Sequence, residues 1–451
     1  MESNRNGITK PSKVAIVGGG LVGSLCACFL AKRGLNVELY EYRNDIRKTE
    51  LVKGRSINLA LSNRGRAALR AVGLESHMVR EYGIPMAGRM IHKLNGNLQE
   101  LLYDPRTNKN LYSVGRKYLN EVLLTAAEKY DNVKLFFNHK LINANLQDGK
   151  LVFRQMETDQ TIELNFDLII GADGAFSAIR KHMMKMPLFD FSQTYIEHGY
   201  MELCIPPDSE GKFQMESNYL HIWPRGEFMM IALPNQDHSW TVTMFMPFAK
   251  FAMLDTTEKL MDFFQKNFPD AIPLIGEDRI IKDFFNATAL PLVSIKCKPY
   301  HVGNRAIIIG DAAHAMVPFY GQGMNAGMED CLLLDQLLEE YNMNISKVLP
   351  EFTRRRHEDA HAICDLAMYN YIEMRDLVNR FTYIIRKKFD DFLFWAFPMY
   401  WVPLYNSVSF STMRYSLCIK NRQWQDKVLK QTSIIVVLFA LFFGFLYSIL
   451  F

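Results

Sequence analysis

A glycine-rich turn near the start of the chain constrains the fold more than any other feature of the sequence. The apolar run Lys13–Val17 leads into Gly18-x-Gly20-x-x-Gly23, and residues 21–32 have helical character. In a strand-turn-helix unit the first glycine allows the tight turn, the second lets a pyrophosphate approach the backbone, and the third lets the helix pack against the strand. The pattern therefore predicts a dinucleotide-binding β-α-β unit.

The second strand of this unit is expected over Asn36–Tyr40, directly before Glu41. A carboxylate at this position bonds a ribose hydroxyl in dinucleotide-binding folds, which favours a nucleotide site over a simple glycine-rich turn. Arg43 leaves two interpretations open: it contacts a nucleotide phosphate, or it is a solvated loop residue.

The rest of the chain continues an α/β pattern with one interruption. Between residues 195 and 248, short apolar segments alternate with Pro, Gly and Asn, which predicts an antiparallel sheet inserted into the nucleotide-binding domain. The other expected elements are a helix over 116–130, strands over 133–137, 167–170 and 305–310, and a helix over 325–339.

Two further glycine-containing motifs follow the later strands. Residues 171–180 read GADGAFSAIR, and residues 310–314 read GDAAH, followed by Pro318 and by GQGMNAG over 321–327. Amides at a helix start can stabilise negative charge on a reduced ring system, and Asp311 can bind a ribityl hydroxyl. We interpret His314 as a structural hydrogen-bonding residue. Each motif alone is compatible with a loop and a helix cap, so their order and spacing carry the argument.

Together these motifs resemble those of the single-component flavin-dependent aromatic hydroxylases. GxGxxG, DGxxSxxR, and GDAAH with a following Pro and GQGMN occur in that order over residues 13–338. Four more segments are similar to the branch of this family that hydroxylates L-kynurenine, and with them the resemblance covers nearly the whole chain. They are RSINLA at 55–60, GRMIH at 88–92, FYGQGMN at 319–325 and MYNYIEMR at 368–375.

The resemblance implies FAD as a permanently bound cofactor and NADPH as a transient co-substrate, since the chain has one GxGxxG motif. No metal is implied. The FAD-binding residues that the resemblance and the glycine turn imply are Gly18, Gly20, Leu21, Val22, Gly23, Glu41, Arg43, Ala60, Arg116, Leu141, Asp173, Asp311, Met324 and Asn325.

The substrate ligands implied by the resemblance are Arg89, Tyr103, Asn370 and Tyr405. Arg89 and Asn370 lie inside matched segments, whereas Tyr103 lies in a divergent stretch and depends on an ungapped spacing from Arg89. The fork of an Arg suits the carboxylate of a zwitterionic amino acid in an apolar pocket. Phe319 and Tyr320 leave two interpretations open: they wall the aromatic substrate, or they pack in the core.

The implied reaction converts L-kynurenine to 3-hydroxy-L-kynurenine with NADPH and O₂, through a flavin hydroperoxide, as a step of tryptophan degradation. The cofactor performs this chemistry, so no catalytic side chain is expected. Two alternatives stay open: a same-fold hydroxylase or epoxidase of another aromatic or lipid substrate, and a flavin-binding membrane scaffold without turnover. A net charge of +4, dispersed along the chain, argues against a nucleic-acid partner.

The C-terminal residues are apolar, and no charge occurs from Ser433 onward. As a helix this stretch is about 28 Å long, close to the ~30 Å hydrocarbon core of a bilayer, which predicts a transmembrane helix. Lys427 and Lys430 precede it, which favours a cytosolic orientation. We therefore expect a tail-anchored protein on the cytosolic face of the mitochondrial outer membrane, as the resemblance implies, with the endoplasmic reticulum as the alternative.

Upstream, residues 392–410 are also apolar and aromatic, but Pro398 and Pro403 interrupt them. We expect this segment to pack against the body or to lie at the membrane interface, not to form a second span.

The predicted fold class is α/β, with a Rossmann-like FAD-binding domain, an inserted antiparallel β-sheet substrate domain, C-terminal helices and a C-terminal transmembrane helix. The expected division is 1–190 and 296–345 for the FAD-binding domain, 191–295 for the substrate domain, 346–430 for the helical region and 431–451 for the anchor.

Overall fold

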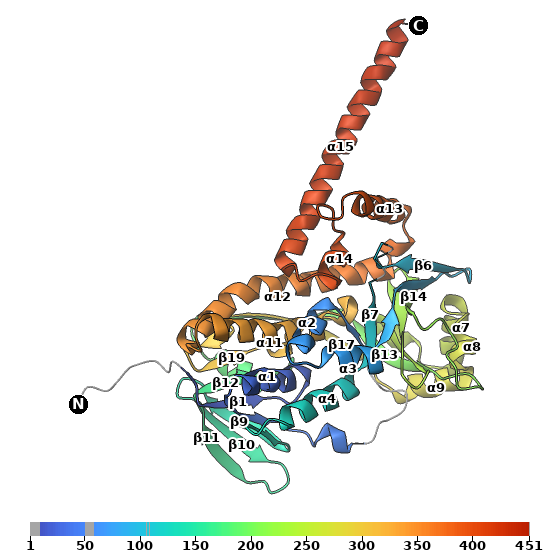
Figure 1. Ribbon diagram of the computed structural model, residues 1–451. Helices are drawn as coiled ribbons and strands as arrows, with labels where there is room; N and C mark the ends of the chain where they lie inside the picture. The colour runs from blue at the N-terminus through green and yellow to red at the C-terminus, as the bar shows by residue number, and fades with distance from the viewer. Residues whose placement is uncertain (1–9, 50–57, 105, 108, 451) are drawn as a thin grey trace.

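The computed structural model describes residues 10–49, 58–104, 106–107 and 109–450, without the side chains of 436, 437, 440 and 447–450. Residues 55–57 of the RSINLA segment and residue 451 lie outside the described part. A nucleotide-binding body and a large, mostly antiparallel sheet, in which only β5 and β14 pair in parallel, lie side by side, long helices cover both, and the last helix projects away from the body (Figure 1).

A parallel sheet forms the centre of the nucleotide-binding body. Its order is β18-β19-β12-β1-β2-β8, and all neighbours are parallel except β18 with β19. This arrangement confirms the β-α-β unit and the later strands predicted from the sequence. The strands are β1 (Lys13–Val17), β2 (Asn36–Tyr40), β8 (Val133–Phe136), β12 (Leu168–Gly171), β18 (His301–Val302) and β19 (Ala306–Ile308).

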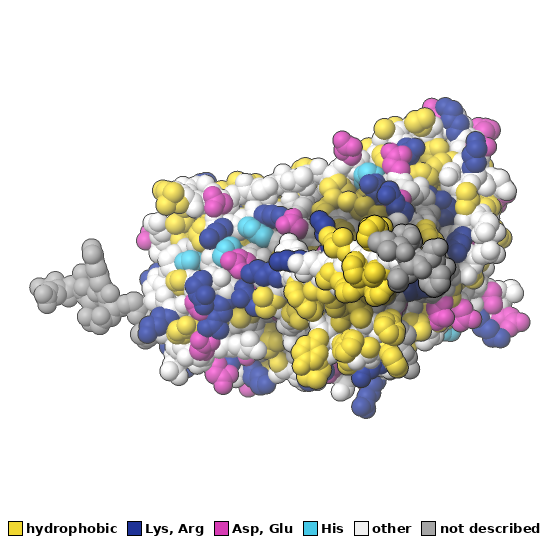
Figure 2. All heavy atoms as spheres, turned by 90° about the horizontal axis from the view of Figure 1, so that it is seen from above, with side chains coloured by type: hydrophobic (Ala, Val, Ile, Leu, Met, Phe, Trp, Pro, Cys, Tyr) yellow, Lys and Arg dark blue, Asp and Glu magenta, His cyan; other side chains and the backbone are white. Residues whose placement is uncertain are grey.

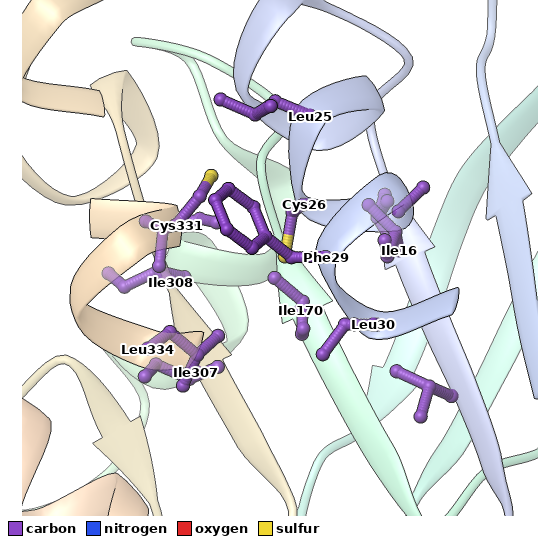
Figure 3. Close-up of a cluster of buried hydrophobic side chains, with 14 of the residues drawn as sticks. Ile16, Leu25, Cys26, Phe29, Leu30, Ile170, Ile307, Ile308, Cys331 and Leu334 are labelled. Carbon is purple, nitrogen blue, oxygen red and sulfur yellow. The ribbon is translucent and has the colours of Figure 1, made fainter. Parts of the chain in front are cut away.

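Both faces of this sheet are covered. Helices α1 (Leu21–Lys32), α4 (Arg116–Glu128) and α11 (Gly323–Glu340) lie on one side. Figure 3 shows side chains of α1 and α11 packed among isoleucines of the central strands. The small sheet of β9 (His139–Asn145), β10 (Lys150–Gln155) and β11 (Thr161–Asn165) covers the other side, where Tyr40 stacks on Phe153 with ring centroids 4.2 Å apart. Burial on both faces explains the continuous apolar runs of these strands.

The second large sheet has seven strands in the order β17-β13-β16-β15-β14-β5-β6. It confirms the antiparallel sheet expected between residues 195 and 248, and β5 and β6 extend it with residues that precede that region. The division into domains stays a prediction. The strands are β5 (Gly88–His92), β6 (Leu98–Leu102), β13 (Asp190–Ile205), β14 (Tyr219–Arg225), β15 (Phe228–Pro234), β16 (Trp240–Pro247) and β17 (Leu290–Lys298).

Successive side chains of these strands point to opposite faces. On β14, Trp223 belongs to a core shared with the short helices, whereas Ile222 belongs to a core shared with α12. The short helices are α6 (Phe248–Met253), α7 (Thr257–Asn267), α8 (Ile272–Ile275) and α9 (Glu277–Asn286).

Smaller elements connect the two sheets. The order of the third sheet is β3-β7-β4, from β3 (Asn58–Leu61), β4 (Ile84–Met86) and β7 (Leu111–Gly115). The remaining short helices are α2 (Asn63–Ala71), α3 (Glu75–Glu81), α5 (Ala178–Met183) and α10 (Asp311–His314).

The C-terminal region is helical, as the sequence predicts, with α12 (Ile345–Arg375), α13 (Phe381–Ala396), α14 (Leu404–Ser409) and α15 (Tyr415–Leu450). The two prolines divide the apolar segment 392–410 as expected, because α13 ends before Pro398 and α14 begins directly after Pro403. Trp401, between these helices, is buried, and its Nε1 donates to Asp390 of α13 at 2.9 Å.

The expected transmembrane helix over 431–451 is not confirmed. Within the described residues, no helix is long and apolar enough to cross a membrane. The first half of α15 carries charged residues such as Arg422, Asp426 and Lys430, and part of its apolar second half lies outside the described side chains.

A buried polar cluster joins the seven-stranded sheet to its helices. Asp270, which follows α7, accepts a hydrogen bond from Trp223 Nε1 at 2.8 Å and lies 2.7 Å from His92 Nδ1. Burial raises the pKa of Asp270, but the bonds from His92 and Trp223 outweigh burial and hold the pKa below its usual value. Folding lowers the pKa of this carboxyl group, so its ionised form stabilises the folded protein at pH values above the pKa of the group in the unfolded chain. This stabilisation is lost as the pH falls through the pKa of the group in the folded protein.

Asp270→Ala is expected to lower the free energy of unfolding by about 1–3 kcal/mol at neutral pH, because Trp223 Nε1 loses its acceptor and His92 Nδ1 loses its hydrogen-bond partner. The difference from wild type should begin to shrink below about pH 4, the usual pKa of an aspartate, and should be smallest once the pH lies below the lowered pKa of Asp270 in the folded protein. Denaturant titrations at neutral and acidic pH measure both effects. Asp262→Ala, at an exposed position on α7, is the control and should be neutral. Equal stability of wild type and Asp270→Ala at neutral pH would contradict this role.

Candidate active site

The glycine turn has the geometry of a pyrophosphate cradle. Gly18 has φ +108°, and a Cβ there would lie 2.4 Å from the Ala172 carbonyl oxygen. A Cβ on Gly23 would lie 1.9 Å from the Gly18 carbonyl oxygen, so the turn and α1 touch backbone to backbone. A Cβ on Gly20 meets no atom within 4 Å. The space beside Gly20, at a helix start without a side-chain cap, therefore suits a phosphate group.

The three motifs, far apart in the sequence, meet around the start of α1. Gly18 touches Ala172 of the second motif, as described. On the other side, a Cβ built on Gly310 would lie 3.1 Å from Val22 Cγ2, and a Cβ on Gly327 would lie 2.5 Å from the same atom. Leu21 is buried in the same first turn. The structure thus brings the three motifs of the resemblance together around the first turn of α1.

Glu41 is buried at the end of β2 and holds the turn in place. Its carboxylate accepts hydrogen bonds from the Gly19 amide at 2.8 Å and from Arg43 Nε at 2.7 Å. Arg43 is therefore paired with Glu41, although its side chain is largely exposed. Leu141 is buried on β9, whose first residue, His139, donates its amide to the Glu41 carbonyl oxygen at 2.9 Å.

Helix α4 begins with Arg116 and runs beside α1. One turn later, Asn120 donates a hydrogen bond from Nδ2 to the Gly19 carbonyl oxygen at 3.1 Å. The Asn120 Oδ1 is buried without a donor among the described residues. Since residues four apart share a helix face, Arg116 lies on the same face as Asn120. Sequence reasoning missed Asn120, although a polar residue between apolar positions of the helix was a usable signal.

Asp173 points back into its own motif. Its carboxylate accepts hydrogen bonds from the Ser177 hydroxyl at 2.6 Å and from the amides of Ala178 at 2.6 Å and Ile179 at 3.1 Å. Burial raises the pKa of Asp173 above its usual value, although these bonds act in the opposite direction. Asp173 therefore caps α5, and its predicted contact with FAD stays a prediction.

The third motif is tied to β3 by Asn325. Its Nδ2 donates to the carbonyl oxygens of Ala60 at 2.8 Å and Gly321 at 2.7 Å, and its Oδ1 accepts from the Ser62 amide at 2.8 Å. All these partners are backbone atoms, so the side chain fixes the loop that precedes α11. Met324 is half-buried beside it in the first turn of that helix.

A buried carboxylate, Asp330 on α11, holds the other end of this motif. Its Oδ2 accepts from the Gly310 amide at 2.7 Å and lies 2.6 Å from His314 Nε2, while Oδ1 accepts from Arg356 Nε at 2.5 Å. Burial raises the pKa of Asp330, but His314 and Arg356 outweigh it and lower the pKa. His314 is thus structural, as expected, and the neighbouring Asp311 remains exposed at the start of α10.

Arg89 on β5 is a buried cation that faces α12. Its guanidinium donates to Glu373 Oε1 at 3.0 Å and to Asn370 Oδ1 at 3.3 Å, and it lies 4.5 Å from the Tyr405 ring centroid. Burial lowers the pKa of Arg89, but Tyr405 and Glu373 more than offset this, so the pKa lies above its usual value. Its Nε is buried and has no acceptor among the described residues. This N–H group of the guanidinium can therefore donate a hydrogen bond to a ligand.

Aromatic rings line the space beside Arg89. Tyr405 stacks on Tyr103 with centroids 5.0 Å apart and on Tyr320 with centroids 5.4 Å apart. Asn370 donates from Nδ2 to the Phe319 carbonyl oxygen at 2.7 Å, which ties α12 to the third motif. The structure therefore gathers all four predicted substrate ligands, Arg89, Tyr103, Asn370 and Tyr405, in one place. Phe319 and Tyr320 are both buried there.

Sequence reasoning missed two residues of this site. Glu373 follows Asn370 by three positions, a spacing that puts both on one helix face and that could have identified it. Tyr383 on α13 donates its hydroxyl to Glu373 Oε1 at 2.9 Å, and no pattern in the sequence announced it. Burial, with the Glu373 carboxylate, holds the pKa of Tyr383 well above its usual value, so the hydroxyl keeps its proton.

A cavity runs from these residues toward the surface between α13 and the helices that follow it. Its inner end is aromatic and contains Arg89, whereas its outer end has charges of both signs. The lining residues are Arg89, Leu101, Leu102, Tyr103, Tyr369, Glu373, Tyr383, Arg386, Lys387, Asp390, Asp391, Pro403, Leu404, Tyr405, Asn406 and Arg422.

Comparison with known proteins identifies the family. Residues 11–367 match the family model described as FAD binding domain. A kynurenine 3-monooxygenase of Anopheles gambiae is 63% identical over 95% of this chain and 88% of its own length. The chain belongs to the kynurenine 3-monooxygenase family. A relative of the same name in Sus scrofa is 51% identical over 93% of this chain and 88% of its own length. Another in Myxococcus xanthus is 42% identical over 93% of this chain and 90% of its own length, so the family includes proteins of mammals and bacteria.

Solved structures support the fold of this family member. A 2-methyl-3-hydroxypyridine-5-carboxylic acid oxygenase has a TM-score of 0.65 at 20% identity, over 82% of this chain and 93% of its own. PqsL of Pseudomonas aeruginosa, in complex with 2-aminobenzoylacetate, has a TM-score of 0.65 at 18% identity, over 81% and 96%. These similarities show the fold alone.

The glycine turn of this kynurenine 3-monooxygenase family member gives a matched pair of variants. Gly20→Ala adds a methyl group that touches no protein atom but would fill space needed by a bound phosphate. FAD content should therefore fall, while the unfolding midpoint of the FAD-free protein stays unchanged. Gly23→Ala pushes α1 off the Gly18 carbonyl oxygen, so FAD content and apoprotein stability should both fall, the latter by at least about 1 kcal/mol. Flavin absorbance and apoprotein unfolding measure the two effects. Full FAD retention by Gly20→Ala would show that no phosphate occupies this space.

Proposed function

We propose that this chain is an FAD-dependent monooxygenase that uses NADPH and O₂ to hydroxylate L-kynurenine to 3-hydroxy-L-kynurenine in tryptophan degradation. Family membership supports the assignment as a flavoprotein monooxygenase, and the geometry around Arg89 supports L-kynurenine as the substrate. The observation that carries the proposal is a buried cation, Arg89, beside a partly buried carboxylate, Glu373, at the end of an aromatic pocket.

The polar end of the pocket suits an α-amino acid. The Nε edge of Arg89 is available to a substrate carboxylate. Both hydrogen bonds of Glu373 end on Oε1, and among the described residues no donor is recorded for Oε2. Oε2 can therefore accept a hydrogen bond from the substrate ammonium group. Charge-assisted hydrogen bonds of this kind are shorter and stronger than neutral ones, so the pair selects a zwitterion over a neutral lipid.

The aromatic end suits the substrate ring. Tyr103 and Tyr405 belong to an apolar cluster that also contacts Ala60. A Cβ on Gly321 would lie 3.2 Å from the Ala60 Cβ, so this cluster borders the third motif. A substrate held by Arg89 therefore extends its ring toward the proposed flavin site, and the buried rings exclude water from it.

The residues of the nucleotide site fit FAD. Space beside Gly20, uncapped amides at the start of α1 and the unpaired Asn120 Oδ1 are what a bound dinucleotide would fill and satisfy. When bound, FAD supplies hydride uptake from NADPH and the activation of oxygen. The chain itself binds and orients the substrate, which is why no acid or base is required of it.

The decisive experiment measures NADPH oxidation by the purified, FAD-loaded protein with and without L-kynurenine. We expect L-kynurenine to stimulate oxidation and to yield a product heavier by one oxygen atom. Stimulation without that product would indicate another aromatic substrate, and no stimulation would favour a lipid substrate or a scaffold role.

Arg89→Lys keeps the positive charge but replaces the planar guanidinium group, which can donate two parallel hydrogen bonds, by an ammonium group. We expect it to weaken the binding of L-kynurenine by about 10–100-fold, because the paired hydrogen bonds to the carboxylate are lost. FAD content should not change, since Arg89 does not contact the glycine turn. Arg106→Lys, on the surface, is the control. Unchanged affinity in Arg89→Lys would refute the carboxylate contact.

We also propose that the C-terminal helix attaches the protein to the cytosolic face of the mitochondrial outer membrane. Support comes from the large apolar side chains that α15 exposes, which are Ile434, Ile435, Leu438, Phe439, Leu441, Phe442, Phe443 and Phe445. Exposed apolar surface of this extent is typical of a membrane or partner contact. Imaging of residues 415–451 fused to a fluorescent protein distinguishes this location from the endoplasmic reticulum.

A further inference from the structure

Helix α13 has two faces of opposite character. Phe381, Ile385, Phe389, Phe392 and Trp395 recur at helical spacing, and each exposes between 47% and 75% of its surface. Lys388 is exposed on the same side. An amphipathic helix that turns its aromatic stripe outward is not explained by packing within this chain, because a surface helix normally turns that stripe toward the core.

The opposite face of α13 lines the substrate cavity. Tyr383, Arg386, Lys387 and Asp390 all contribute to its wall. Tyr383 reaches deepest and donates to Glu373 Oε1, the same oxygen that receives the Arg89 hydrogen bond. The position of α13 therefore sets where a hydrogen-bond donor stands beside the two charged groups of the substrate site.

Ion pairs bind α13 to α15 near the point where the apolar part of α15 begins. Arg386 pairs with Asp426 at 2.7 Å, and Arg422 pairs with Asp390 at 3.1 Å. Viewed along α15, hydrophobic side chains gather around this helix on the surface of the body (Figure 2). The exposed stripe of α13 thus lies at the same end of the molecule as the exposed apolar side chains of α15.

We propose that α13 is an interfacial helix whose aromatic stripe inserts into the surface of a lipid bilayer, and that this contact positions Tyr383 at the substrate site. The proposal rests on the membrane attachment through α15 proposed above. It assigns a second lipid contact and gives it a consequence for substrate binding.

A lipid surface fits the stripe better than a protein partner does. Its residues are large, apolar and interrupted by Lys388, and Trp395 and the exposed Tyr400 have the amphipathic rings found at membrane interfaces. Continuity with the apolar side chains of α15 places the stripe where that helix would meet the headgroups. A second copy of this chain is an alternative that the test below separates.

The contact with lipid is tested by the fluorescence of Trp395. Full-length, FAD-loaded protein is reconstituted into phosphatidylcholine vesicles with and without brominated acyl chains, and flotation confirms attachment. We expect brominated lipid to quench a component of the emission that is absent in Trp395→Phe, which controls for Trp424, also exposed. Protein that floats without quenching of Trp395 overturns the interfacial helix while the attachment through α15 stands. Equal quenching in dilute and concentrated samples argues against self-association.

The effect on the substrate site is tested by the affinity for L-kynurenine in the same vesicles. Tyr383→Phe should weaken binding by about tenfold, as expected for losing a hydrogen bond to a charged group. Phe389→Glu should weaken binding to a similar extent in vesicles and leave it unchanged in detergent. Leu188→Glu, at an apolar residue 94% exposed and far along the chain from α13, is the matched control and should be neutral.

Wild-type affinity of Phe389→Glu in vesicles, together with weakened binding by Tyr383→Phe, would overturn the link between lipid contact and the substrate site. Failure of the wild-type protein to bind L-kynurenine at all would refute the proposed substrate, whereas the quenching of Trp395 would still report on α13. The two experiments therefore distinguish an error in the proposed substrate from an error in the proposed lipid contact of α13.

Discussion

The backbone contact between Gly18 and Gly23 is the constraint on which the rest of the structure depends. A Cβ on Gly23 would stand 1.9 Å from the Gly18 carbonyl oxygen, so α1 can approach the turn after β1 only because Gly23 lacks a side chain, while a Cβ on Gly18 would stand 2.4 Å from the Ala172 carbonyl oxygen. That approach opens the space beside Gly20 and lets the second and third motifs close around the first turn of α1. Nucleotide binding and the packing of the central sheet thus share one steric requirement.

Two carboxylates, the buried Asp330 and the partly buried Glu373, extend this arrangement toward the proposed substrate site. Asp330 fixes the third motif through Gly310, His314 and Arg356, all within 2.7 Å. Glu373 lines the pocket and pairs with Arg89 at 3.0 Å. A buried charge without a partner is costly, so each carboxylate requires its cations to stay in place. Asp330 and its partners have a structural role. Glu373, in contrast, keeps an oxygen atom that can accept a hydrogen bond from an amino-acid ligand.

Helix α13 connects this pocket to the exterior. Its inner face completes the cavity through Tyr383, and its outer face presents aromatic side chains that the body does not cover. Ion pairs join α13 to α15. The proposed lipid contact and the wall of the cavity therefore lie on opposite faces of one helix.

The sequence by itself determined the nucleotide-binding core. Local rules set the glycine turn, the carboxylate after β2 and the alternation of strands and helices, and the predicted elements agree with the structure to within a few residues. The four predicted substrate ligands came from segment resemblance, and only the tertiary structure brought these residues together from β5, the loop after β6, α12 and α14. Glu373 was recognisable in part from its helical spacing to Asn370. Tyr383 was not, because its role arises from the packing of α13 across the pocket, a long-range contact that leaves no periodic trace in the sequence.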